Sequence, residues 1–123
     1  MTAHGFTLLL CAGGRCRTEQ YERAVAALRE VVRTTALGVL VVSPGCVLGP
    51  FSCRLRAAGP VLVVQPCDAR RRPTRSAVRA GPLCIDEDVA VVAAWLRAGR
   101  FDAALLPGRL QTARRTAAAA ARN

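Results

Sequence analysis

An apolar run that ends on a cysteine is the feature that most restricts how this chain can fold. The segment Phe6–Leu10 has the length and composition of a short buried strand, and Cys11 ends it. A glycine-containing loop with a second cysteine, Cys16, then leads to Thr18, a favourable N-cap for a helix. A strand, a thiol-bearing loop and a helix in this order predict sulfur chemistry at the end of the strand.

The next two segments predict a βαβ unit. After the first loop, apolar residues recur at near-helical spacing, at Tyr21, Val25, Leu28 and Val32. The run Leu37–Val42 has no polar alternation, which is typical of a strand covered on both faces. A strand, a helix and a strand in close succession favour parallel pairing of the two strands.

A second cysteine-containing loop follows this second strand. It runs from Ser43 to Cys53, is interrupted by Pro and Gly, and also contains Cys46. Neighbouring parallel strands end at the same edge of a sheet, so we expect this loop beside the one that carries Cys11 and Cys16. Four thiolates from two adjacent loops suit either a 2Fe-2S cluster or a structural zinc ion, and the residues alone leave both open.

The remaining chain predicts two more strands and one more helix. We expect strands at Val61–Gln65 and Arg79–Ile85, joined by an arginine-rich connection, and a helix with Asp86 as its N-cap. The length of 123 residues suits one domain, over 1–110, followed by an Ala- and Arg-rich tail over 111–123.

Charge and hydropathy restrict the compartment and the partners. All eighteen basic residues are arginines, against eight acidic residues, so the net charge is +10. Few aromatic side chains are available to stack on bases, so we expect no specific nucleic-acid binding. No run has the length of a membrane-spanning helix, and the start of the chain lacks the parts of a secretory signal. We therefore expect a soluble cytoplasmic protein without a membrane partner, in which clustered cysteines bind metal more readily than they form disulfides.

Several motifs resemble those of the thioredoxin-like 2Fe-2S ferredoxin family. They are Cys11 at the end of a strand, Cys16 before the first helix, and the segments 44–49 (PGCVLG), 59–66 (GPVLVVQP) and 81–99. The resemblance implies an α/β fold of thioredoxin-like type, with a four-stranded mixed sheet and two main helices. It also implies an electron carrier rather than an enzyme, with a 2Fe-2S cluster held by Cys11, Cys16, Cys46 and one further cysteine.

The second cysteine loop diverges from the family pattern at the fourth ligand. The family has a cysteine four positions after the residue that matches Cys46, and this chain has Pro50 there. A short insertion in the loop explains the shift, so we expect Cys53 to be the fourth ligand. Cys67, directly after the third predicted strand, is the alternative fourth ligand. Cys84, within the fourth predicted strand, is expected to be a buried structural thiol.

A second resemblance uses the same first loop. Cys11-x5-Arg17-Thr18 is similar to the signature of low-molecular-weight tyrosine phosphatases and arsenate reductases. In such a loop, backbone N–H groups and the arginine hold an oxyanion, and the thiolate is the nucleophile. That family needs a late aspartate as general acid, usually followed by proline, and only Asp68 and Asp102 offer weak substitutes here. A metal-free interaction protein with the same fold is a further alternative.

Four arginines flank the proposed cysteine site, namely Arg15, Arg17, Arg54 and Arg56. They suit the docking of an acidic redox protein, and equally suit a solvated basic rim. The sequence also leaves a homodimer open.

Overall fold

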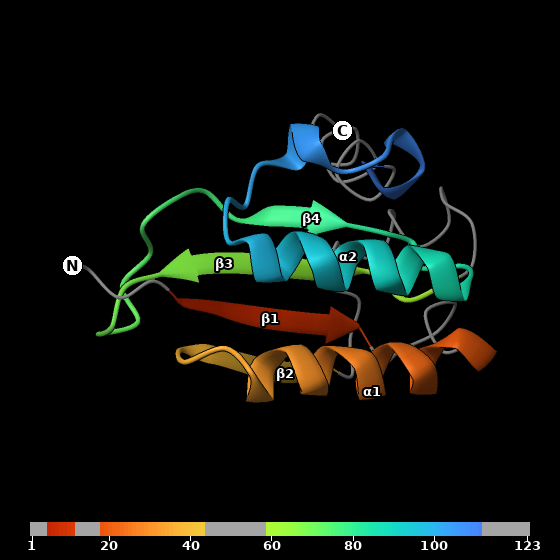
Figure 1. Ribbon diagram of the computed structural model, residues 1–123, viewed down its shortest axis with the longest axis horizontal. Helices are drawn as coiled ribbons and strands as arrows, with labels where there is room; N and C mark the ends of the chain where they lie inside the picture. The colour runs from red at the N-terminus through yellow and green to blue at the C-terminus, as the bar shows by residue number, and fades with distance from the viewer. Residues whose placement is uncertain (1–4, 12–17, 44–58, 112–123) are drawn as a thin grey trace.

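A four-stranded mixed sheet with the strand order β2-β1-β3-β4 forms the centre of the fold (Figure 1). The computed structural model describes residues 5–11, 18–43 and 59–111. The strands are β1 (Gly5–Cys11), β2 (Gly38–Ser43), β3 (Leu62–Cys67) and β4 (Val78–Ala80). β1 and β2 are parallel, whereas β3 is antiparallel to both β1 and β4. The predicted α/β class, the four-stranded mixed sheet and the parallel first pair are confirmed.

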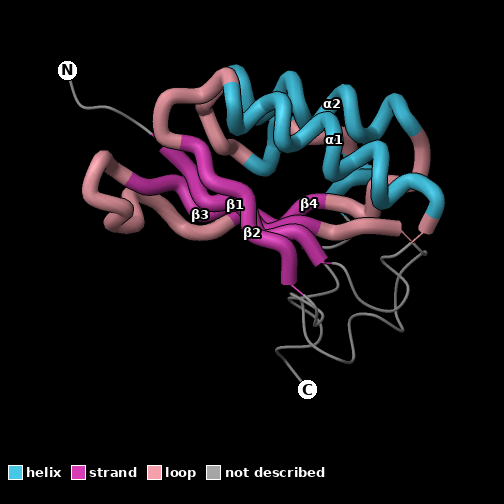
Figure 2. The backbone as a smooth tube through the Cα atoms, turned by 90° about the horizontal axis from the view of Figure 1, so that it is seen from below, coloured by secondary structure: helices cyan, strands magenta, loops and turns pink. Residues whose placement is uncertain are grey.

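Two helices lie on the same face of this sheet (Figures 1 and 2). α1 (Glu19–Arg33) connects β1 to β2, and α2 (Asp86–Ala98) follows β4. The two helices also pack against each other. Because β1 and β4 run in the same direction, both helices begin at the end of the sheet where β1 ends.

The hydrophobic core lies between the sheet and the helices. Alternate residues of β1 face the helices, and Phe6, Leu8 and Leu10 are almost completely buried. Leu28 of α1 and Val92 of α2 are fully buried opposite them. In α1 the predicted apolar face is confirmed for its first three members, but Val31 takes the fully buried position that Val32 was expected to occupy.

The other face of the sheet is less well covered. Val39 and Val41 of β2 lie on this face and are 41% and 43% exposed, and Val42, on the helix-facing side next to Leu10, is still 39% exposed. The prediction that this strand is covered on both faces is therefore wrong within the described part of the chain. The physical reason is that β2 is an edge strand and both helices lie on one side of the sheet.

The fourth strand and the start of α2 differ from the prediction. β4 contains only three residues, because Gly81 and Pro82 follow directly and proline has no N–H to donate to a neighbouring strand. The N-cap of α2 is Ile85, so Asp86 is the first helical residue instead of the cap. The capping acceptor is Asp88, whose Oδ2 accepts the backbone N–H of Ile85 at 3.3 Å.

The chain after α2 returns along the edge of β4. Two short 3-10 helices, η3 (Ala103–Leu105) and η4 (Gly108–Gln111), form this segment. The side chain of Leu110 is fully buried, and its carbonyl accepts the N–H of Gly81 at 2.9 Å. The segment up to Gln111 thus packs against the sheet, and all of the predicted tail beyond that residue lies outside the described residues.

Candidate cysteine site at the end of the sheet

Cys11 lies at the end of β1, where two cysteine-containing segments leave the sheet. Its partner in the parallel register is Ser43, the last residue of β2. Its backbone N–H donates to the carbonyl of Val61 at 3.1 Å, and Val61 lies shortly after the described chain resumes at Gly59. Segments 12–17 and 44–58 therefore start from adjacent positions, and the second one also ends beside them. This is the arrangement expected from the parallel pairing.

The structure describes one of the four predicted ligands. Cys11 is fully buried. The other three predicted ligands lie outside the described residues, as do the arginines expected to flank the site: Cys16, Cys46, Cys53, Arg15, Arg17, Arg54 and Arg56.

Cys67 lies at the opposite end of the sheet from Cys11. It ends β3 and pairs with Gly5, the first residue of β1, in the antiparallel register. Cys11 is six residues further along β1, which at the rise of a strand corresponds to about 20 Å. A ligand to the same metal centre must lie within a few ångströms of the other ligands. The prediction of Cys67 as an alternative fourth ligand is therefore wrong.

Cys84 lies near the Cys11 end and is exposed, so its predicted role as a buried thiol inside a strand is also wrong. The residue before it, Leu83, donates its N–H to the carbonyl of Pro60 at 2.8 Å, and Pro60 is adjacent to the residue that Cys11 contacts. The Gly81-Pro82 pair was the sequence signal that places Cys84 beyond the strand. Cys84 is thus a thiol near the candidate site that the sequence interpretation missed.

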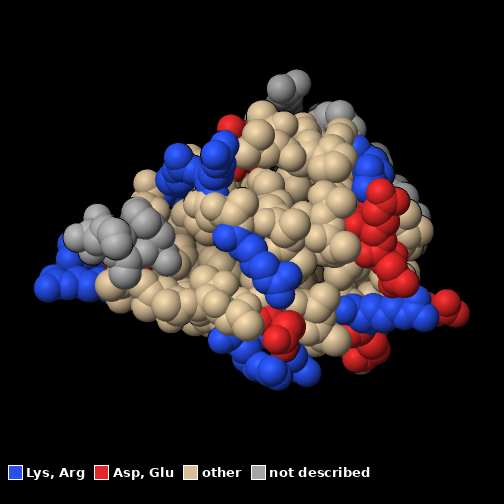
Figure 3. All heavy atoms as spheres, viewed as in Figure 1, with Lys and Arg blue, Asp and Glu red and all other residues tan. Residues whose placement is uncertain are grey.

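Both helix N-termini are at this end of the molecule, and each carries acidic residues. The positive end of a helix dipole is equivalent to about half an elementary charge, and it favours a negatively charged group nearby. The first turns contain Glu19 and Glu22 in α1, and Asp86, Glu87 and Asp88 in α2. Figure 3 shows acidic side chains at the end where the two helices start.

A hydrogen-bonded contact joins the starts of the two helices. The side chain of Gln20 is buried in α1 and donates Nε2–H to Oδ1 of Asp86 at 2.5 Å. Arg23 lies 3.4 Å from the same carboxylate. The hydrogen bond from Gln20 lowers the pKa of Asp86, and the charge of Arg23 lowers it further, so this carboxylate stays ionised at neutral pH.

A second contact fixes the residues around Cys84. Asp88 is 3% exposed, and its Oδ2 accepts the N–H of Cys84 at 3.0 Å. Its Oδ1 accepts Nε–H of Arg109, in η4, at 2.6 Å. Burial by itself would raise the pKa of Asp88, but the hydrogen bonds from Arg109, Cys84 and Ile85 outweigh burial and lower it. The backbone beside Cys84 is thereby held to the C-terminal segment.

The two aspartates considered as general acids are at the wrong end for a reaction at Cys11. Asp68 follows β3 directly, and Asp102 lines the same cleft as Gly5 and Cys67. Both therefore lie about a strand length, roughly 20 Å, from Cys11. General acid catalysis requires hydrogen-bond reach, so neither aspartate can serve a nucleophile at Cys11.

Comparison with family models, curated proteins and solved structures gave no match to this chain. Within residues 5–11, 18–43 and 59–111, no group of three or more His, Cys, Asp or Glu side chains is arranged to hold a metal ion. No helix in the same part of the chain is long and apolar enough to cross a membrane.

Proposed function

We propose that this protein is a thioredoxin-like 2Fe-2S ferredoxin that transfers single electrons between protein partners. The observation that carries the proposal is the register pairing of Cys11 with Ser43, from which the two cysteine-containing segments leave the sheet side by side. The mixed four-stranded sheet with two helices on one face agrees with the architecture that the sequence resemblance implies.

The donor set suits the cluster chemically. Two thiols come from the first segment, counting Cys11, and two from the second, and four thiolates are the usual complement of a 2Fe-2S cluster. The ligands would be Cys11, Cys16, Cys46 and Cys53. When bound, the cluster supplies a centre that accepts and releases one electron. A four-thiolate cluster is an anion. The dipoles of the two helices that start at this end of the sheet favour negative charge there, whereas the acidic residues of their first turns oppose it.

Two observations on the described residues argue against a phosphatase at Cys11. A phosphatase would need the Cys11 thiolate to reach its substrate, and this side chain has no exposed surface. It would also need a general acid within hydrogen-bond reach. Asp86 and Asp88, in the first turn of α2 at the same end of the sheet, both have lowered pKa values and are ionised at neutral pH. Electron transfer requires neither group.

The proposed partner is an acidic redox protein that meets the arginines of the two cysteine-containing segments. The first turns of α1 and α2 at the same end of the sheet are acidic and would repel such a partner, so they restrict the orientation in which it docks. Complementary patches of this kind mainly set orientation and association rate. We expect the rate of electron transfer to depend on ionic strength.

Anaerobic purification followed by iron, zinc and sulfide analysis tests the proposal. We expect two irons and two sulfides per chain, visible absorption bands, and a paramagnetic signal after one-electron reduction. A colourless zinc protein would retain a four-thiolate site but refute electron transfer. A metal-free protein that hydrolyses an aryl phosphate in a Cys11-dependent manner would establish the phosphatase instead.

A further inference from the structure

A cleft of about 580 Å³ lies at the end of the sheet opposite Cys11. Its walls are the first residue of β1, the end of β3, the residues before β4, and the turn after α2. This volume lies within the usual range for small-molecule sites. The proposed electron-transfer site makes no use of this cleft.

Two arginine side chains line the cleft. Arg75 lies before β4, and Arg100 lies in the turn after α2. Arg75 donates Nη1–H to the backbone carbonyl of Arg100, and this bond connects the two walls. A guanidinium has five N–H donors, so most of those of Arg75 remain available to a ligand. Neither arginine forms a salt bridge with any acidic residue of the described chain.

Among the described residues that line the cleft, one is acidic, and it already has a structural role. Asp102 caps η3, because its Oδ1 accepts the N–H of Ala104 at 2.9 Å. Two guanidinium groups against one carboxylate leave the cleft with an excess positive charge. Planar guanidinium groups bind carboxylates and phosphates through paired hydrogen bonds, so the excess charge favours an oxyanion.

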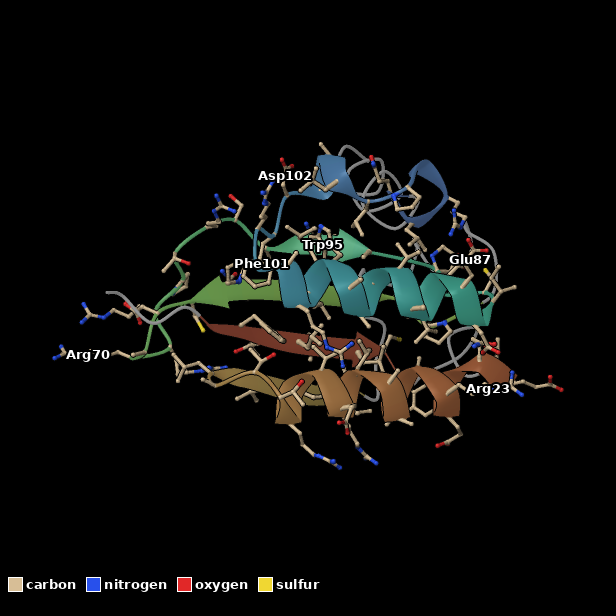
Figure 4. The ribbon with its side chains drawn as sticks, in the orientation of Figure 1. Arg23, Arg70, Glu87, Trp95, Phe101 and Asp102 are labelled. Carbon is tan, nitrogen blue, oxygen red and sulfur yellow. The ribbon has the colours of Figure 1, made fainter. Side chains whose placement is uncertain are left out.

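Apolar residues also line the cleft, and the backbone of one of them, Phe101, is strained. Phe101 has a φ of 54°, in the left-handed region that non-glycine residues seldom adopt. Its ring makes edge-to-face contacts with Phe6 and Trp95, at centroid distances of 5.7 and 6.0 Å. Figure 4 shows Phe101, Trp95 and Asp102 together at this end of α2. Backbone strain that is held by packing recurs at binding sites, and here it keeps Arg100 and Asp102 in the wall of the cleft.

The surrounding charge also favours an anionic ligand. The same end of the molecule carries the basic residues of the β3–β4 connection and of the two helix C-termini: Arg33, Arg70, Arg71, Arg72 and Arg97. Arg70 is seen at the tip of the connection in Figure 4, whereas Glu87 lies at the opposite end of the molecule. Glu30 and Asp68 are also at this end, where they pair with Arg33 and Arg72, so the arginines leave a net excess of positive charge. A net positive field over a cleft raises the local concentration of anionic ligands.

We propose that this cleft binds a small organic oxyanion, a carboxylate or phosphate monoester with a compact apolar body. The guanidinium groups of Arg75 and Arg100 bind the oxyanion. The apolar body contacts Phe101, Leu105 and Cys67, all of which line the cleft. This inference is independent of the cluster, because the cleft and Cys11 are at opposite ends of the sheet.

Trp95 provides a built-in reporter for a test. It is the only tryptophan in the chain, and its Nε1–H donates to the carbonyl of Asp102 at 2.9 Å. The protein as purified, with its metal content intact, is titrated with phenyl phosphate, benzoate and inorganic phosphate while tryptophan fluorescence is recorded. We expect saturable binding of phenyl phosphate or benzoate in the millimolar range or tighter, and weaker binding of inorganic phosphate, which lacks the apolar body.

Matched variants locate the site. Arg75→Ala and Arg100→Ala should each raise the dissociation constant about tenfold, because each removes a charge-assisted hydrogen-bond donor. Arg23→Ala is the control; this residue is also an exposed arginine, but it lies at the opposite end of the molecule and does not line the cleft, so affinity should stay unchanged. Amide shifts in NMR spectra should centre on Cys67 and Phe101. Absence of saturation with all three probes, or equal loss of affinity in the Arg23 control, would overturn the proposal.

Discussion

Cys11 and Ser43 are partners at the last paired position of the parallel strands β1 and β2. This relationship brings the origin of one cysteine-containing segment next to the origin of the other. The backbone N–H of Cys11 also bonds to Val61, close to the point where the second segment returns. Both cysteine-containing segments therefore start from one end of the sheet. A cysteine can be a ligand of the candidate site only if it lies near this end.

The first prediction concerns which cysteines retain the cluster. Cys11→Ser should abolish the bound iron and sulfide, because it removes the proposed ligand at the end of β1. Cys67→Ser is the matched control, since this cysteine is also buried at a strand end but lies about 20 Å away. It should leave iron, sulfide and the visible spectrum at wild-type values. Loss of the cluster in the Cys67 variant, with retained helical circular dichroism, would contradict the placement of the site.

The fourth ligand is the second prediction. Cys53→Ser should reduce iron and sulfide as severely as Cys11→Ser. Cys84→Ser should leave them unchanged, although Cys84 is exposed near the same end of the sheet. The reverse result, with the cluster lost only in the Cys84 variant, would reassign the fourth ligand to Cys84.

The third prediction concerns the pH dependence of stability through Asp88. Its pKa is lowered in the folded protein, so its contribution is fully present above the unfolded value of about 3.9 and is lost as the pH falls through the folded value. Asp88→Asn removes the ion pair with Arg109 and should lower the free energy of unfolding by about 2 kcal/mol at neutral pH. The difference from wild type should shrink below about pH 4.

The control for that experiment is the neighbouring residue Glu87. Its carboxylate is 3.9 Å from Arg109, and its side chain is 72% exposed. Glu87→Gln should change the free energy of unfolding by less than about 0.5 kcal/mol, as is usual for exposed pairs. Urea unfolding at several pH values measures both variants. An Asp88→Asn effect that persists unchanged in acid would show that the charge of Asp88 is not its cause.

The sequence predicted the first half of the fold better than the second. Apolar runs and helical spacing located β1, α1 and β2, because local periodicity and short connections determine a βαβ unit. The fourth strand was predicted to extend through Ile85 because its apolar residues outweighed the Gly81-Pro82 pair. Coverage of β2 could not be predicted, since it depends on both helices lying on one face of the sheet.

The same contrast applies to the candidate sites. The cysteine-bearing ends of β1 and β2 could be placed beside each other from the parallel register alone. The position of Cys67 could not, because it depends on β3 pairing antiparallel to β1, and antiparallel pairing sends the end of β3 to the start of β1. The cleft formed by Arg75 and Arg100 had no local signature, because the two residues are separated by the whole of β4 and α2.

A fourth prediction concerns Arg71, which connects the β3–β4 loop to the sheet. Its guanidinium donates to the carbonyls of Leu37 and Phe6 and to the hydroxyl of Thr7, the last at 2.7 Å. Arg71→Ala should lower the free energy of unfolding by about 1–2 kcal/mol, because two backbone carbonyls near the starts of β1 and β2 lose a charged donor. Arg70→Ala, next to it in the same exposed loop, should have an effect below about 0.5 kcal/mol. Equal effects in urea unfolding would show that the contacts of Arg71 do not stabilise the fold.

The fifth prediction separates packing from backbone strain at Phe101. Phe101→Ala removes the ring contacts with Phe6 and Trp95 and should cost about 3 kcal/mol, whereas Leu105→Ala, at a residue 53% exposed, should cost under about 0.5 kcal/mol.

Phe101→Gly completes this comparison. Glycine has no steric penalty at the φ of 54°, which costs an alanine about 1 kcal/mol or more, but it also increases the entropy of the unfolded chain. The glycine variant should therefore be at least as stable as the alanine variant, and both should be well below wild type. If the glycine variant instead matched wild type, the strain relieved would equal the packing energy lost. The ring contacts would then give no net stabilisation of the conformation at Phe101.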